Sequence, residues 1–118
     1  MVDYSYYAAR FNLLSEDEFT QYEALAKSFI DTRGRTNVIE EVVYDYNNSI
    51  DDVRIEPYKN AICAVAEKFQ MKATTDREIT SVSNDGYSET YTNSLDDELI
   101  KAARFYLKGT GIWGAIYV

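Results

Sequence analysis

The sequence has no histidine, a single cysteine (Cys63) and a single proline (Pro57) among its 118 residues. Without histidine, the chain lacks the commonest general base, the usual partner of a nucleophilic serine or cysteine, and a frequent transition-metal ligand. One cysteine excludes a disulfide within the chain, which is typical of a reducing compartment. Cys63 stands in an apolar helical run, which favours a buried structural thiol over a reactive one.

Basic residues and long apolar runs are also scarce. Lys and Arg number 12 against 20 Asp and Glu, which gives a formal charge of −8. Such a charge argues against a free-standing nucleic-acid binder, which needs bases to displace counterions from phosphates. No run approaches the roughly 20 apolar residues that span a bilayer, and the first ten residues do not form a signal peptide. We therefore expect a soluble chain made in a cytosol.

Motifs for catalysis or cofactor binding are missing. The sequence matches no calcium loop, phosphate-binding glycine loop or dinucleotide fingerprint. Its adjacent acids do not face each other on a helix, so they make poor general acid and base pairs. Without histidine, none of the many Ser and Tyr hydroxyls is activated as a nucleophile. We predict that the chain is not an enzyme and binds no cofactor or metal. The adjacent acids are Glu40 with Glu41, Asp51 with Asp52, and Asp96 with Asp97.

What is present fits one domain, residues 1–118, built from helices. An irregular aromatic N-terminus, 1–14, precedes a first helix at 15–31. Ser15 and Glu18 have the spacing of a capping box, which marks the start of that helix. In the segment 37–45 helix and strand compete, since Val and Ile fit both, and we favour helix.

Two further helices complete the predicted bundle. Helix 57–70 has Pro57 in its first turn, where a missing N–H costs little. Its small residues allow close contact with neighbouring helices, so we expect it to be the central one. Helix 94–108 ends at Gly109 and Gly111, which are residues that terminate helices.

Residues 78–92 read as a polar β-hairpin. β-Branched and aromatic residues flank Asn84-Asp85-Gly86, which tolerates the positive φ of a tight turn. The predicted fold class is therefore mainly α with a small β-hairpin, a compact bundle of about four helices with the hairpin between the third and fourth. An isolated hairpin is marginally stable in water, so this ribbon needs contacts with the rest of the fold or with another copy.

The apolar segment 109–118 follows a glycine hinge. Left free it would favour aggregation, so it either folds back on the helices or docks into a partner. One hypothesis is that truncation after Gly111 leaves a folded monomer that fails to join its partner. The candidate assembly contacts in the hairpin and this segment are Ile79, Val82, Tyr87, Tyr91, Trp113, Ile116 and Tyr117.

A run of acids lies between Glu40 and Glu56, where six carboxylates face the single base Arg54. A solvated acidic flank is the default interpretation of such a run. The candidates for an acidic lumen or surface flank are Glu40, Glu41, Asp45, Asp51 and Asp52. Carboxylates spread over one face would instead suit a small acidic DNA mimic that inhibits a nuclease or repressor.

Five short segments, taken in order, resemble one known family. They are 14–19 (LSEDEF), 26–35 (AKSFIDTRGR), 59–67 (KNAICAVAE), 79–91 (ITSVSNDGYSETY) and 107–112 (LKGTGI). In this order the chain resembles the small head–tail connector proteins of long-tailed bacteriophages, also called head-completion or adaptor proteins. The segment 40–56 has no counterpart in the resemblance.

The resemblance implies a helical bundle with a protruding hairpin, assembled as a dodecameric ring beneath the portal. Such a ring extends the DNA channel and supports the next neck or tail component. The implied partners are other copies of the chain, the portal protein, a downstream stopper or tail protein, and passing DNA, with no membrane. The implied location is the virion neck, after synthesis in the host bacterial cytoplasm. A tail-terminator or other virion ring protein is a further alternative, which would have a dominant sheet.

Overall fold

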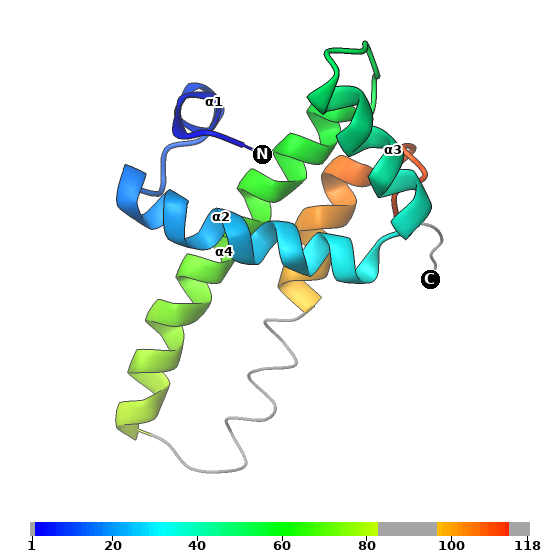
Figure 1. Cartoon of the computed structure of the whole chain (residues 1–118). Coiled ribbons are helices and arrows are strands. Elements are labelled where there is room, and N and C mark those ends of the chain that lie inside the picture. Colours follow the sequence, from blue (N-terminus) through cyan, green and yellow to red (C-terminus); the bar gives the residue numbers. More distant parts are fainter. Residues whose placement is uncertain (1, 83–96, 114–118) are drawn as a thin grey trace.

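Helices make up the regular structure of the part of the chain that the computed structural model describes, residues 2–82 and 97–113 (Figure 1). Side chains are described for 2–71 and 97–113. The helices are α1 (Tyr4–Arg10), α2 (Glu16–Arg33), α3 (Thr36–Asn47), α4 (Ile55–Val82) and a C-terminal helix over residues 97–107. These described residues contain no strand, so the helical bundle is confirmed and the small β-hairpin is wrong.

The predicted hairpin overlaps the end of α4. The helix continues without interruption past residue 70, where the predicted helix ended, and through Ile79 to Val82. Once a helix has formed, each added residue gains a backbone hydrogen bond at small entropic cost. That gain outweighs the modest strand preference of Ile79, Thr80 and Val82. The remainder of the predicted hairpin, 83–92, lies outside the described residues.

The N-terminal segment also differs from the expectation, because part of 1–14 forms α1. Asp3 caps this helix, and its carboxylate accepts a hydrogen bond from the backbone N–H of Tyr6 at 2.9 Å. The helix spans only two turns, and its stability comes from packing rather than propensity. The ring of Tyr7 is fully buried and stacks on Phe19 of α2, with ring centroids 4.6 Å apart.

The predicted capping box at the start of α2 is confirmed. Ser15 accepts a bond from the backbone of Glu18, and the Glu18 carboxylate accepts one from the Ser15 N–H, at 3.3 and 3.0 Å. Leu14 and Phe19, which flank the cap, are both buried. The helix runs two residues past the expected end and stops at Arg33.

Residues 36–47 form helix α3 and not a strand, as favoured from the sequence. Its N-cap is Arg35, which makes no side-chain capping bond. Ile39 and Val42 are buried against the core. The helix is therefore held by its apolar side rather than by its cap.

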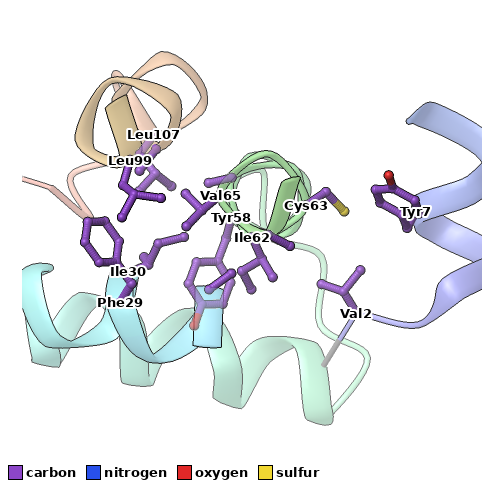
Figure 2. Packing of buried hydrophobic residues seen from close by; sticks show 14 of the residues in the cluster. Val2, Tyr7, Phe29, Ile30, Tyr58, Ile62, Cys63, Val65, Leu99 and Leu107 are labelled. Carbon is purple, nitrogen blue, oxygen red and sulfur yellow. The ribbon is translucent and has the colours of Figure 1, made fainter. Parts of the chain in front are cut away.

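The first half of α4 is the centre of the molecule, as predicted. Tyr58, Ile62 and Val65 are fully buried in it, together with the small residues Ala61, Cys63 and Ala66. In Figure 2, viewed along α4, the C-terminal helix lies above it, α1 lies beside it, and α2 and α3 lie below. Small side chains let these neighbours approach closely, which is how one helix serves as the core for four others.

The residues that follow the C-terminal helix contact the junction between α2 and α3. The backbone N–H of Arg35 donates to the carbonyl of Ile112 at 2.7 Å, and Ile112 itself is fully buried. Gly34 lies at this junction, where an added Cβ would stand 2.7 Å from Ile39 Cδ1 and 3.1 Å from Trp113 Cδ1. A side chain at this position would force Ile39 and Trp113 to shift, so glycine favours the close approach of these segments.

Candidate assembly surfaces

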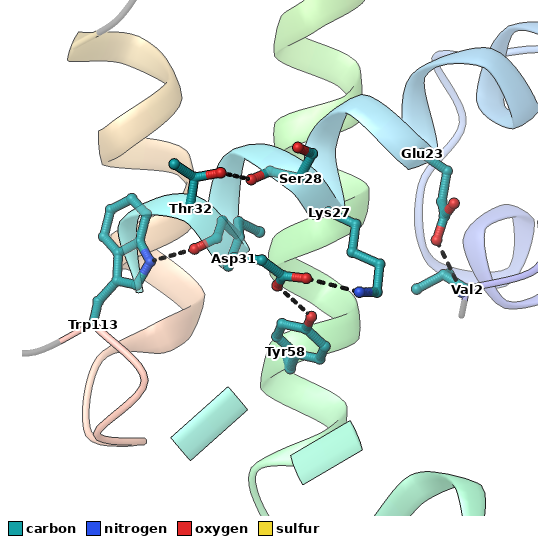
Figure 3. A network of polar contacts seen from close by, with 9 residues as sticks. Val2, Glu23, Lys27, Ser28, Asp31, Thr32, Tyr58 and Trp113 are labelled. Carbon is teal, nitrogen blue, oxygen red and sulfur yellow. Dashed lines mark hydrogen bonds and ion pairs between the residues drawn. The ribbon is translucent and has the colours of Figure 1, made fainter. Parts of the chain in front are cut away.

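Trp113, one of the predicted docking anchors, is engaged within its own chain. Its indole N–H donates to the Ile30 carbonyl at 3.4 Å, and its ring lies against Phe29 with centroids 6.3 Å apart (Figure 3). Gly109 and Gly111 adopt φ of +85° and +81°, which turns the chain back toward α2. Residues 110–113 therefore fold back onto the helices, which was one of the two expected outcomes for this segment.

The other predicted assembly contacts are not brought together by the described residues. Ile79 and Val82 lie in the last turns of α4, where only the backbone is described. The remaining four lie outside the described residues: Tyr87, Tyr91, Ile116 and Tyr117.

The acidic run forms a corner where α3 ends and α4 begins, and we call residues 40–56 the acidic corner. Arg54 organises it: its guanidinium contacts Asp52 at 2.7 Å and Glu41 at 2.9 Å. The backbone N–H of Ile50 donates to the carbonyl of Asp45 at 2.8 Å and fastens the loop to α3. Among the predicted acidic residues, two therefore contact the same base.

Two of these carboxyls influence each other. Bonds to Arg54 hold the pKa of Asp52 well below its usual range. The pKa of Asp45 is raised, first because its carboxyl hydrogen-bonds to that of Asp52 and then by desolvation. Asp52 is thus the ionised partner of the arginine, whose guanidinium pKa is raised in turn by Asp52 and Glu41. The other predicted acids, Glu40 and Asp51, are exposed to solvent.

Exposed apolar side chains accompany these charges. Val53 is 91% exposed, Tyr44 is 61% exposed and Ile50 is 45% exposed. All three belong to the acidic corner, on the end of α3 and the loop that follows it. Large apolar side chains among like charges are typical of a contact surface rather than of a purely solvating flank.

A second surface, on the C-terminal helix, was missed from the sequence. Its outer side carries Lys101, Arg104, Phe105 and Lys108, all exposed, and we call these four residues the basic face. Phe105 is 75% exposed, and its ring meets Tyr106 edge-on with centroids 4.9 Å apart. The sequence does contain a signal for this surface. Phe105 lies between basic residues and does not share the helical spacing of the buried residues Leu99, Ala103 and Leu107.

The polar side chains in the interior have hydrogen-bond partners within the chain, which indicates a structural role. The Tyr7 hydroxyl donates to Glu67 at 2.7 Å and accepts from the Leu14 N–H at 2.7 Å. The Tyr58 hydroxyl donates to Asp31 at 2.6 Å, and Lys27 bonds the other oxygen of that carboxylate at 2.7 Å (Figure 3). Within the residues whose side chains are described, no buried side-chain N or O atom lacks a partner.

Burial governs the ionisation of these interior groups. Desolvation, followed by the bonds to Glu67 and Asp31, raises the pKa of Tyr7 and of Tyr58 well above 10. Desolvation, with Glu67 as the next cause, raises the pKa of the Cys63 thiol to about 12. The cysteine is therefore a neutral, buried thiol, as its sequence context favoured.

The described residues offer little for a small ligand or a metal ion. A shallow hollow of about 430 Å³ lies along α2, but Lys27 and Asp31, which line it, already bond to each other. Among residues 2–71 and 97–113, no three His, Cys, Asp or Glu side chains are grouped so that they could hold a metal. None of the helices in the described ranges has the length and apolar character of a bilayer span.

Comparison of the chain with protein-family models, with curated proteins and with solved structures gave no match.

Proposed function

We propose that this protein is a structural subunit of a bacteriophage neck, a head–tail connector that assembles as a ring beneath the portal. In that role it extends the DNA channel and supports the next neck or tail component. The proposal rests on the ordered resemblance of the segments beginning at Leu14, Ala26, Lys59 and Leu107. The segment beginning at Ile79 gives no support to a protruding hairpin, since α4 runs into it.

The observation that carries the proposal is the length of α4. Its buried residues lie between Tyr58 and Ala66, and by Met71 the side chain is 44% exposed. The helix nevertheless continues to Val82, so that its last eleven residues add about 16 Å of helix. In Figure 1 these turns run past the other helices. A helix that reaches beyond the other helices of its own chain offers surface that neighbouring chains of an assembly can contact.

The acidic DNA mimic is the less favoured alternative. A mimic needs carboxylates that stay free to occupy a basic site in place of phosphates. In the acidic corner, Asp52 and Glu41 are bonded to Arg54, and Asp45 is bonded to Asp52. These contacts engage three of the carboxylates within the chain. Along the sequence, the exposed apolar residues Ile50 and Val53 separate the remaining acids.

Electron microscopy of the full chain mixed with the portal protein of the same virus tests the proposal. The expected result is a ring on the portal axis, on the side to which the tail attaches. A matched control is the same chain with Ser28→Ala on the exposed outer side of α2, which should give the same ring. Portals that remain bare at high concentrations of the folded chain would disprove the connector role.

A further inference from the structure

The basic face is an apolar residue surrounded by bases. Phe105 projects from the C-terminal helix between Arg104 and the flanking Lys101 and Lys108. Within the described residues these three bases form no ion pair, whereas Glu98 at the start of the helix bonds to Lys68 at 3.3 Å. An exposed aromatic residue with a charged rim has the composition of an interface centre.

The acidic corner has the opposite charge and a similar apolar content. Its six carboxylates against the single Arg54 leave a formal charge of −5, compared with +3 on the basic face. Val53, Ile50 and Tyr44 supply exposed apolar surface in the same corner. The two surfaces therefore match each other in charge and in character, while neither matches itself.

The two surfaces occupy different parts of the molecule. The basic face is on the C-terminal helix, and the acidic corner joins α3 to α4. Figure 2, viewed along α4, shows the C-terminal helix above α4 and α3 below it. Two complementary patches on different sides of one subunit generate a heterologous contact, which repeats from copy to copy and closes into a ring when the rotation permits.

We propose that the basic face of one copy docks on the acidic corner of the next copy, with Phe105 covered by Val53, Ile50 and Tyr44. This inference rests on the proposed ring, and it specifies the patches through which neighbouring subunits meet. The exposed carboxylates Glu40 and Asp51 would then face the bases of the neighbouring C-terminal helix.

Cysteine trapping of the full chain tests this contact even if it is weak. Cys63 is buried with a raised thiol pKa, so it can stay in place. We expect an oxidised mixture of Phe105→Cys and Val53→Cys chains to give several-fold more covalent dimer than either variant alone. Ser28→Cys, on the outer side of α2, is the matched control and should not trap either partner above background. Equal yields in all mixtures, or preferential pairing of Phe105→Cys with itself, would overturn the proposal.

Charge-reversal variants test whether the two surfaces recognise each other through their opposite charges. Lys101→Glu with Arg104→Glu in the Phe105→Cys chain should reduce the mixed product at least about tenfold, because like charges then meet. Glu40→Lys with Asp51→Lys in the Val53→Cys chain should restore it. Added salt should lower the unreversed yield, because exposed charges are screened. A reversed pair that still traps at the original yield would refute the electrostatic match.

The portal experiment distinguishes failure of this contact from failure of the proposed function. If unaltered chains form a ring on portals and the Lys101→Glu, Arg104→Glu chain forms it equally well, the contact is wrong and the connector role stands. If the cysteine pair traps as expected but portals stay bare, the contact stands and the connector role fails. If DNA suppresses trapping by binding the basic face at physiological salt, the face belongs to nucleic acid and the proposed contact is overturned.

Discussion

Two aromatic residues near the end of the described chain differ in their surroundings. Trp113 turns inward, bonds to the Ile30 carbonyl and lies against Phe29. Phe105, eight positions earlier, points outward and is 75% exposed. The sequence suggested the first as a docking anchor and gave no weight to the second. The difference shows that the aromatic residues which complete the fold are distinct from those left exposed at the surface.

This separation has an energetic meaning. Contacts made by Trp113, Ile112 and Tyr7 stabilise the free subunit, so their loss should appear as a lower free energy of unfolding. Contacts available to Phe105 exist only between molecules, so its loss should leave the unfolding free energy nearly unchanged. The following changes test this distinction, in order of decreasing expected effect on the free energy of unfolding.

The largest effect is expected from truncation after Gly111. Removing Ile112 and Trp113 opens the core and should lower the unfolding free energy by about 4 kcal/mol, which is much of a typical domain's stability. Such a chain should melt at a much lower temperature than the full chain when followed by circular dichroism. A chain that ends at Trp113 keeps both contacts and is the matched control. Equal melting temperatures for the two truncations would contradict the inward role of Trp113.

Alkaline pH should have the second-largest effect and should lower the free energy of unfolding. Tyr7 and Tyr58 have pKa values raised above the unfolded value of 10, so the folded state favours their neutral forms. Their stabilising contribution is fully present below pH 10 and is lost as pH rises above it, at about 1.4 kcal/mol per pH unit for each group. Urea unfolding between pH 8 and pH 11 measures the decline. Tyr58→Phe should flatten it, and an unchanged slope in that variant would refute the assignment.

A single interior hydroxyl gives a smaller effect. Tyr7→Phe deprives the Leu14 N–H and the Glu67 carboxylate of a partner, which should cost about 2 kcal/mol. Chemical denaturation measures this difference directly. Tyr6→Phe is the control, since its hydroxyl bonds only to Asn60 in a partly exposed position and should cost less. A larger loss for Tyr6→Phe would reverse the expected ranking.

The smallest effect on folding is expected at Phe105. Phe105→Ala should change the unfolding free energy by no more than about 0.5 kcal/mol, because the side chain is mostly in solvent. Trp113→Ala, the inward counterpart, should cost about 2 kcal/mol. Parallel thermal melts compare them. If Phe105→Ala destabilises the chain as much as Trp113→Ala, the contrast between the two residues does not hold.

The parts of the fold that were predictable carry strong local signals. Ser15 with Glu18 marked the start of α2, and Gly109 marked the end of the C-terminal helix, because caps act over a few residues. The small residues around Cys63 identified the central helix. The chemistry of these segments does not depend on distant parts of the chain.

The errors arose where distant contacts or helix continuation decide the structure. The only local signal described for α1 is its N-cap Asp3, and the helix depends on the stacking of Tyr7 on Phe19 and on the bond of Tyr7 to Glu67. Strand-favouring residues such as Ile79 follow a helix that is already formed, so extension prevails. Phe105 stands outside any apolar run, and an isolated aromatic residue among bases lies on the surface.

The bond between Arg35 and Ile112 joins residues far apart in the sequence. During synthesis, α2 and α3 emerge from the ribosome long before Ile112 can seal the junction beside Gly34. Partial chains would therefore lack both the seal and the C-terminal helix that bears Phe105. The junction between α2 and the residues after the C-terminal helix therefore forms only after the last part of the described chain has been synthesised.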